Sequence, residues 1–114
     1  MYGDPWPREP RLDPFRDAVW ELSLDGEVVG HVLTAVGRMR SLPWFWVKQE
    51  WVWWQVHWLD GRPTNPQEDH GPGWLAVGEL EQGCLVPDLD GVRYDARPVG
   101  EPERTRLWER YGAP

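Results

Sequence analysis

The strongest structural signal in this chain is AVWELSLDGEVVGHVLTAV, residues 18–36. In its first half apolar residues alternate with others, which is the period of a half-buried β-strand: Trp20, Leu22 and Leu24. Asp25-Gly26 follows, and this dipeptide is typical of a two-residue type I′ turn. We therefore predict a β-hairpin made of strands at 18–24 and 27–36.

The turn also predicts the register of this hairpin. A two-residue loop without irregularity pairs Trp20 with His31 and Glu21 with Gly30. His31 is then a candidate functional residue beside an indole, and a hydrogen-bonded core histidine is the alternative. A glycine inside a strand, here Gly30, marks a bulge or a close approach of two backbones.

A second apolar segment, Trp44–Leu59, follows a loop at 37–43. Its Trp, Phe and Val content favours β-structure, so we predict a bent strand or two strands, broken near Lys48-Gln49-Glu50 or by a bulge at Trp53-Trp54. An amphipathic helix is the alternative, because several apolar residues recur at helical spacing: Trp44, Val47, Trp51, Trp54 and Trp58.

The remaining segments complete a mainly β prediction. A long loop at 62–73 is followed by predicted strands at 74–80, 84–89 and 92–99, the second at a sheet edge because it contains Pro87. Acidic residues and a proline predict the start of a C-terminal helix at about 102–111, and Gly112 predicts its end. The expected fold is a small antiparallel barrel or strongly curved sheet of about six strands with this one helix.

Residues 1–17 differ in composition from the rest, with four prolines among alternating charges. Proline removes a backbone donor and biases the preceding residue towards extended geometry, so we predict an extended arm. Trp6, Leu12 and Phe15 are candidates to attach this arm to the rest of the fold or to another subunit, and a frayed terminus is the alternative. Residues 18–114 are then a single β-rich domain.

Length and charge exclude several classes of protein. The 114 residues carry a formal net charge of −7, which argues against binding to a nucleic-acid backbone. No apolar run reaches the length of a membrane helix and no signal-peptide pattern precedes the hairpin, so a soluble cytoplasmic protein is expected.

The single Cys84 cannot form an internal disulfide. A strong excess of Arg over Lys and the absence of Ile indicate a GC-rich bacterial gene.

The ten tryptophans are the clearest functional signal. Six lie in one segment and are the candidate binding residues, together with three polar neighbours: Trp44, Trp46, Trp51, Trp53, Trp54, Trp58, His57, His31 and Glu50. Strand alternation puts Trp51 and Trp53 on one face, and Trp54 and Trp58 on the other. These indoles either fill a core, anchor a protein interface, or line a pocket for a flavin-like, aromatic or sugar ligand.

Catalytic and metal-binding patterns are weak by comparison. Glu68-Asp69-His70 carries metal-ligating groups in the long loop, but no spacing directs them to one centre, and no metal or cofactor is expected. His57 and Glu50 fall on opposite faces of a regular strand, so an acid–base dyad requires a bulge between them. Cys84 has no neighbouring base and is expected to be an inert buried thiol.

Two stretches resemble known proteins. GVRYDARPVG (91–100), running into ERTRLWER (103–110), resembles a strand–helix stretch of deazaflavin-dependent nitroreductases of the split-barrel class. The cofactor-binding patterns of that family are absent upstream, so the resemblance transfers no site residue. WELSLDGEVVG (20–30) resembles the opening hairpin of small bacterial proteins and implies no activity.

These observations predict a non-enzymatic interaction module with a Trp-anchored surface, which binds a protein partner or assembles as a homo-oligomer. Acidic residues between 79 and 103 either form a solvated face that keeps the protein soluble or attract a basic partner. The alternative is a small-molecule-binding barrel or accessory enzyme with an indole-lined pocket.

Overall fold

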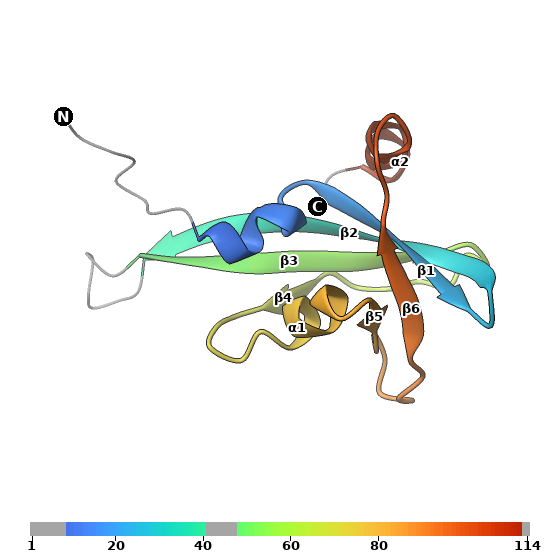
Figure 1. Ribbon diagram of the computed structural model, residues 1–114, viewed down its shortest axis with the longest axis horizontal. Helices are drawn as coiled ribbons and strands as arrows, with labels where there is room; N and C mark the ends of the chain where they lie inside the picture. The colour runs from blue at the N-terminus through green and yellow to red at the C-terminus, as the bar shows by residue number, and fades with distance from the viewer. Residues whose placement is uncertain (1–8, 41–47, 113–114) are drawn as a thin grey trace.

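The computed structural model describes residues 9–40 and 48–112 (Figure 1). In chain order the elements are η1 (Pro10–Phe15, a 3₁₀-helix), β1 (Ala18–Leu24), β2 (Glu27–Arg40), β3 (Lys48–Trp58), β4 (Gln67–Asp69), α1 (Leu75–Glu81), β5 (Cys84–Leu85), β6 (Tyr94–Pro98) and α2 (Glu103–Tyr111). The six strands form one antiparallel sheet in the order β4-β3-β2-β1-β6-β5, curled into a half-barrel. The predicted strongly curved β-sheet with a C-terminal helix is confirmed.

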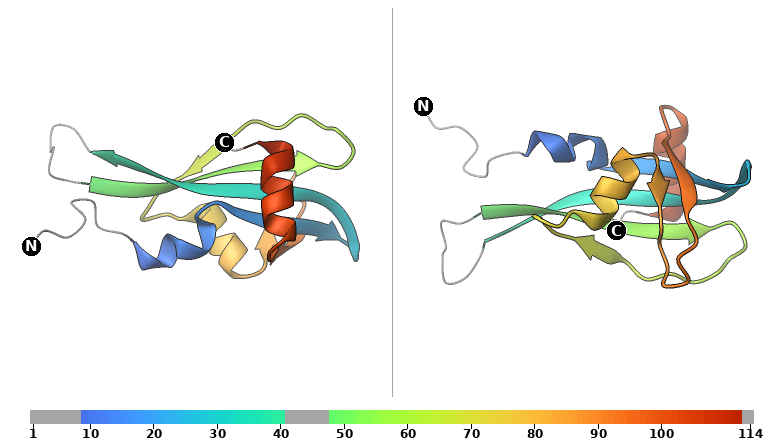
Figure 2. Two further views of the ribbon diagram at one scale, coloured as in Figure 1. Left: turned by 90° about the horizontal axis from the view of Figure 1, so that it is seen from above. Right: turned by 60° about the horizontal axis from the view of Figure 1, so that its bottom comes forward.

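The curl gives the sheet an inner and an outer face, each with its own hydrophobic cluster. Helices η1 and α1 cover the inner face, while α2 crosses the outer face above β1 and β2 (Figure 2). The inner cluster contains Leu12 and Phe15 of η1 together with Val77 and Leu80 of α1. The smaller outer cluster joins α2 to the sheet through three buried residues: Val19, Leu33 and Leu107.

The hairpin formed by β1 and β2 has the predicted turn but a different register. Asp25 and Gly26 both have positive φ, at 52° and 82°, as a type I′ turn requires. A β-bulge then shifts the pairing by one residue, because Ser23 pairs with Val28 but Leu22 pairs with Gly30. The predicted pairing of Trp20 with His31 is therefore wrong.

The second apolar segment is one continuous strand where the structure describes it. β3 pairs with β2 from Lys48 opposite Arg40 to Trp58 opposite Gly30, with no shift in register. The strand prediction is confirmed for 48–58, whereas the helical alternative and the predicted bulge at Trp53-Trp54 are wrong. The break predicted near Lys48 falls at the start of the described strand and stays a prediction. Residues 44–47 lie outside the described residues.

The predicted strand at 74–80 is instead the helix α1. Its buried residues, Ala76, Val77 and Leu80, follow helical spacing, while Leu75 is 74% exposed. The carboxylate of Asp69 accepts hydrogen bonds from the backbone N–H groups of Leu75 (2.9 Å) and Val77 (2.8 Å). This cap comes from another element, β4, so the local sequence around the helix gives no sign of it.

Removing this cap should destabilise the fold. In Asp69→Ala, two N–H groups at the start of α1 lose a charged acceptor that is only 7% exposed. We expect a loss of about 2 kcal/mol in the free energy of unfolding, measured by urea denaturation. Glu68→Ala is the matched control, because the neighbouring Glu68 is exposed and caps no helix. Equal effects of the two substitutions would contradict the capping role.

Three other segments differ from or refine the sequence prediction. The loop predicted at 62–73 contains the short strand β4. The strands predicted at 84–89 and 92–99 shorten to β5, which does form a sheet edge, and β6. Pro10–Phe15 forms the 3₁₀-helix η1 inside the segment expected to be extended, and residues 1–8 of that segment lie outside the described residues.

Helix α2 coincides with the helix predicted at about 102–111 and ends at Gly112, as expected. Within residues 9–40 and 48–112, no helix combines the length and apolar character needed to cross a membrane.

Candidate functional site

Alternation along β3 divides the tryptophan-rich strand between the two faces of the sheet. Val52, Trp54, Val56 and Trp58 point to the inner face, and all four contribute to the inner hydrophobic cluster. Trp51, Trp53, Gln55 and His57 point to the outer face and are half-buried. The four described tryptophans of this segment therefore have two different environments.

The two inward indoles stabilise the fold. Trp58 is 8% exposed and its ring lies 5.2 Å from that of Tyr94, centroid to centroid. The guanidinium of Arg62 covers Trp58, with its carbon 4.2 Å from the ring centroid. Trp54 packs against the same cluster. These two candidate binding residues therefore contribute to the core.

The two outward indoles lie beside small residues of β2. Opposite Trp51 on β2 is Gly37, and opposite Trp53 is Ala35. A Cβ atom at Gly37 would lie 2.7 Å from the Trp51 ring, so only glycine lets the indole rest on the β2 backbone. His70, just after β4, stacks against Trp51 with centroids 5.6 Å apart. We call these five residues the Trp51–Trp53 face.

The other two candidate tryptophans of the segment, Trp44 and Trp46, lie outside the described residues.

Both candidate histidines lie on the outer face, where the structure brings them together. His31 of β2 and His57 of β3 are direct cross-strand partners, and the bulge in the first hairpin puts Glu21, not Trp20, on the other side of His31. The ring of Tyr111 from α2 stacks on His57, with centroids 4.4 Å apart. Its hydroxyl lies 3.1 Å from Nδ1 of His31.

The environment of this cluster disfavours charge on either imidazole. Burial lowers the pKa of His31 below its ordinary value, and Arg110 acts in the same direction. Burial also lowers the pKa of His57, with a further contribution from His31. Both effects favour the neutral form of the two imidazoles.

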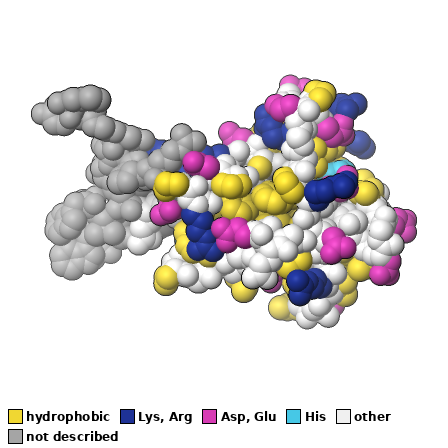
Figure 3. All heavy atoms as spheres, in the orientation of Figure 1, with side chains coloured by type: hydrophobic (Ala, Val, Ile, Leu, Met, Phe, Trp, Pro, Cys, Tyr) yellow, Lys and Arg dark blue, Asp and Glu magenta, His cyan; other side chains and the backbone are white. Residues whose placement is uncertain are grey.

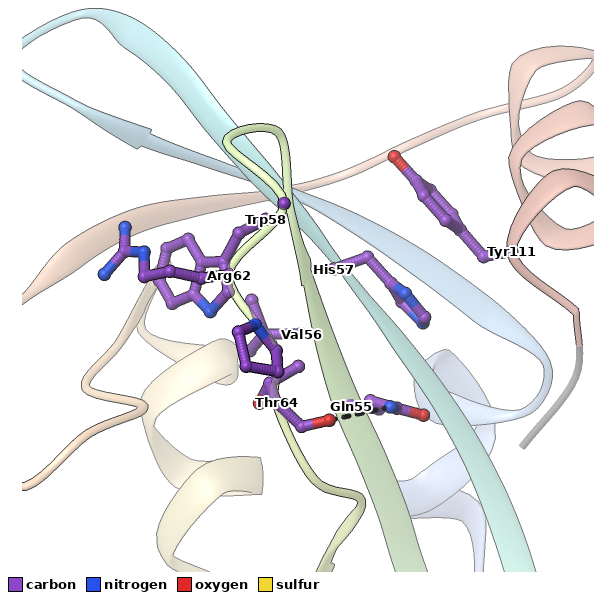
Figure 4. Close-up of a pocket in the computed structure, with 9 residues that line it drawn as sticks. Gln55, Val56, His57, Trp58, Arg62, Thr64 and Tyr111 are labelled. Atoms are coloured by element: carbon purple, nitrogen blue, oxygen red, sulfur yellow. Dashed lines mark hydrogen bonds between the residues drawn. The ribbon is translucent and has the colours of Figure 1, made fainter.

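A cleft of about 330 Å³ opens beside His57 and Tyr111 (Figure 4). Its other walls come from the end of β3 and the loop after it: Gln55, Val56, Trp58, Gly61, Arg62, Pro63 and Thr64. The Gln55 side-chain amide donates a hydrogen bond to the Thr64 carbonyl, which holds the loop against the strand. No residue in the described part of the chain hydrogen-bonds to the imidazole of His57.

Glu50 has a different role from the one expected. It lies on the face of β3 opposite to His57, and the regular register leaves no bulge that would bring the two together. Its carboxylate, 3% exposed, binds both terminal nitrogens of Arg16 at 3.0 Å and accepts the Glu9 N–H at 2.7 Å. Arg38 lies 3.4 Å away. Glu50 therefore attaches the N-terminal segment to the sheet.

The remaining candidates for chemistry are separated. Asp69 faces α1, whereas His70 stacks on Trp51, so the acidic loop does not converge on one centre. Across residues 9–40 and 48–112, no three His, Cys, Asp or Glu side chains are grouped so that they could hold a metal ion. Cys84 is 5% exposed and its thiol faces the Glu79 carbonyl.

A second, more apolar cleft of about 390 Å³ lies where the half-barrel is open between η1 and β6. Hydrophobic side chains are visible there in the space-filling view (Figure 3). It is lined by Pro14, Phe15, Trp20, Leu80, Glu81, Gly83, Ala96 and Pro98.

Sequence reasoning missed two residues that organise these sites. Tyr111 lies in the predicted C-terminal helix, and Arg16 is one of the alternating charges of the predicted arm. Tyr111 meets its histidine partners through docking of α2, and Arg16 meets Glu50 across 34 residues of chain. Neither contact has a local sequence signal.

Comparison with known proteins does not assign the chain to a family, because no family model, curated protein or solved structure matches it. The stretch that resembles nitroreductases does form a strand followed by a helix, β6 and α2. Without a matching family, that local arrangement implies no activity.

Proposed function

We propose that the protein is a non-enzymatic interaction module that binds a partner protein through the Trp51–Trp53 face. One observation carries the proposal: among the described tryptophans, only Trp51 and Trp53 belong to neither hydrophobic cluster. The others all pack within or against a cluster: Trp20, Trp54, Trp58, Trp74 and Trp108. Tryptophan is among the residues that most often dominate the binding energy of protein interfaces.

The shape of the surface supports this function. Side chains two residues apart on one strand lie about 7 Å from each other, so the two indoles form a continuous apolar surface. The small residues of β2 beside them, Ala35 and Gly37, leave the two indoles as the largest groups on this surface. Polar His70 and Glu68, the latter opposite Trp53 on β4, border it. An apolar centre with a polar border is the usual composition of a protein interface.

Charge indicates the kind of partner. The chain carries a net charge of −7, and Glu68 lies at the border of the Trp51–Trp53 face. Complementary charges steer association and exclude partners of like charge. We therefore expect a partner with basic residues around an apolar contact.

The test replaces both indoles. In Trp51→Ser/Trp53→Ser, affinity for the partner should fall at least about thirtyfold, because one tryptophan hot spot contributes about 2 kcal/mol or more. The measurement is a quantitative pull-down from lysate of the source organism, with sedimentation analysis to detect self-association. The free energy of unfolding should fall by much less than the roughly 3–5 kcal/mol lost when a core tryptophan is truncated.

Leu89→Ser is the matched control, because Leu89 is a fully exposed apolar residue remote from the Trp51–Trp53 face. This variant should bind as the wild type does. Unchanged binding by the double tryptophan variant, or its unfolding, would contradict the proposal.

A second candidate function, small-molecule binding, is favoured by the cleft beside His57. Its volume of about 330 Å³ is that of a small ligand site, and the imidazole lacks a hydrogen-bond partner in the described chain. Only one indole, Trp58, contributes to its walls, so the pocket differs from the indole-lined one expected. Native mass spectrometry separates the two functions, because a small non-covalent adduct favours the cleft and a co-purifying protein favours the interface.

A further inference from the structure

Helix α2 is attached to the outer face of the sheet by few side chains. Leu107, 5% exposed, packs with Val19 and Leu33, and Trp108 packs against the same cluster. Its last turn rests on the two histidines through Tyr111, whose ring stacks on His57 with an interplanar angle of 17°. The docking of this last turn therefore depends on two titratable side chains.

We propose that His31, His57 and Tyr111 form a pH-dependent clasp, which holds α2 on the sheet while both imidazoles are neutral and releases it when they are protonated. This regulation is separate from the proposed interaction through the Trp51–Trp53 face and does not depend on it.

The arrangement of the rings explains why protonation opposes docking. Cross-strand partners have Cβ atoms about 5 Å apart, so two charged imidazoles at these positions repel each other. In the tautomer protonated at Nε2, neutral His31 accepts a hydrogen bond from the Tyr111 hydroxyl at Nδ1. A protonated Nδ1 can only donate, so this hydrogen bond must reverse its direction when His31 becomes charged. Because α2 covers both rings, it also removes water that would solvate their charge.

The charged groups around the clasp do not reverse this effect. Those facing it are Glu21 from β1, Glu103 and Arg110 from α2, and Arg62 from the loop that lines the cleft. Glu21 and Glu103 favour a charged His31, but each carboxylate already pairs with an arginine, Arg97 and Arg106 respectively. Burial outweighs them, and the pKa values of both histidines lie below 6.5.

The direction of the pH dependence follows from these shifts. A group whose pKa is lower in the docked state than in the undocked state favours docking in its neutral form. The stabilisation of docked α2 is therefore complete above pH 6.5, the ordinary histidine value. It is lost as the pH falls from 6.5 through the lowered pKa values.

The experiment uses the full chain in solution, from about pH 8 to about pH 5, where histidines titrate. Imidazole NMR resonances give the pKa values of His31 and His57, and amide hydrogen exchange gives the protection factors of α2. We expect both pKa values below 6.5. Protection in α2 should fall over the same pH range, by about tenfold for each unit of the summed pKa shifts.

Two variants distinguish the clasp from a general acid effect. His31→Gln/His57→Gln should abolish this pH dependence, whereas His70→Gln should retain it, because His70 stacks on Trp51 and does not contact α2. Retention in the double variant, or protection that is constant with pH in the wild type, would overturn the proposal.

A milder change covers the case in which the double variant fails to fold. Tyr111→Phe keeps the ring on His57 but removes the hydroxyl that hydrogen-bonds to neutral His31. Burial, the main cause of both lowered pKa values, is retained, so both should stay below 6.5 and the fall of α2 protection in acid should persist. Protection that no longer depends on pH in this variant would overturn the proposal.

Discussion

Replacing Phe15 with alanine should cost the protein about 3–5 kcal/mol of unfolding free energy, the usual loss for a fully buried phenylalanine. Its ring is 0% exposed and stacks on Trp20, with centroids 5.4 Å apart. Its carbonyl accepts a hydrogen bond from the buried hydroxyl of Thr34 at 2.9 Å, and that hydroxyl accepts one from the Trp20 indole. Truncation leaves a cavity between η1 and the sheet that these neighbours cannot close.

Urea denaturation measures this loss as a shift of the midpoint at an unchanged slope. Leu75→Ala is the control, because it removes a large apolar side chain that is 74% exposed and should change stability by no more than about 0.5 kcal/mol. If Phe15→Ala unfolded at the same urea concentration as the wild type, packing of η1 on the sheet would contribute nothing to the stability of the fold.

The same contacts change how the N-terminal segment is to be tested. Predicted as an extended arm, residues 1–17 contain Leu12 and Phe15, which are both 0% exposed in the inner cluster. Deleting the whole segment therefore removes core residues as well as any assembly contact. A loss of assembly in such a truncation would not identify the segment as an interface.

Local sequence signals predicted those parts of the fold that depend on local physics. The Asp25-Gly26 turn and the two-residue alternation of β1 are properties of neighbouring residues, and the structure has both. The bulge lies at Val29, beside Gly30, the residue that indicated a bulge or a close approach. The register that follows from it was not predicted, because it depends on packing across the sheet. Helix α1 was missed because its N-terminal cap, Asp69, belongs to a separate strand.

For the candidate site, too, the sequence predicted only what depends on neighbouring residues. Alternation alone grouped Trp51 with Trp53 and Trp54 with Trp58, but which pair faces the core depends on the direction in which the sheet curls. The pairing of His31 with His57 depends on the register between β2 and β3, and their contact with Tyr111 depends on docking of α2. Sequence periodicity predicts which side chains share one face of a strand. It does not predict these contacts, because they depend on the tertiary structure.

Glu50→Gln should be the second strongly destabilising substitution, at about 3 kcal/mol. It keeps the size of the side chain but removes the charge that holds Arg16 in a two-point contact at 3.0 Å. The carboxylate is 3% exposed and the guanidinium 19% exposed, so little water replaces the lost partner. Breaking one side of a buried ion pair typically costs 3–5 kcal/mol, and the partial exposure of Arg16 favours the lower end.

This loss should depend on pH in a definite direction. Hydrogen bonding by Arg16, with the Glu9 N–H and the charge of Arg38, holds the pKa of Glu50 below its ordinary 4.5. A carboxylate with a lowered pKa stabilises the fold fully above pH 4.5, and this contribution disappears as the pH falls through the lowered value. The stability difference between wild type and Glu50→Gln should therefore be largest near neutral pH and shrink in acid.

Glu81→Gln is a closely matched control, since Glu81 also binds an arginine, Arg11, at two points, 2.9 and 2.7 Å. That pair is exposed, with 38% of the Glu81 side chain in contact with solvent, so water screens it and its loss should cost little. Urea denaturation of both variants at several pH values makes the comparison. Equal losses would mean that burial of Glu50 contributes nothing, and a gap between wild type and Glu50→Gln that persists in acid would mean that the lost stability is not that of the ion pair.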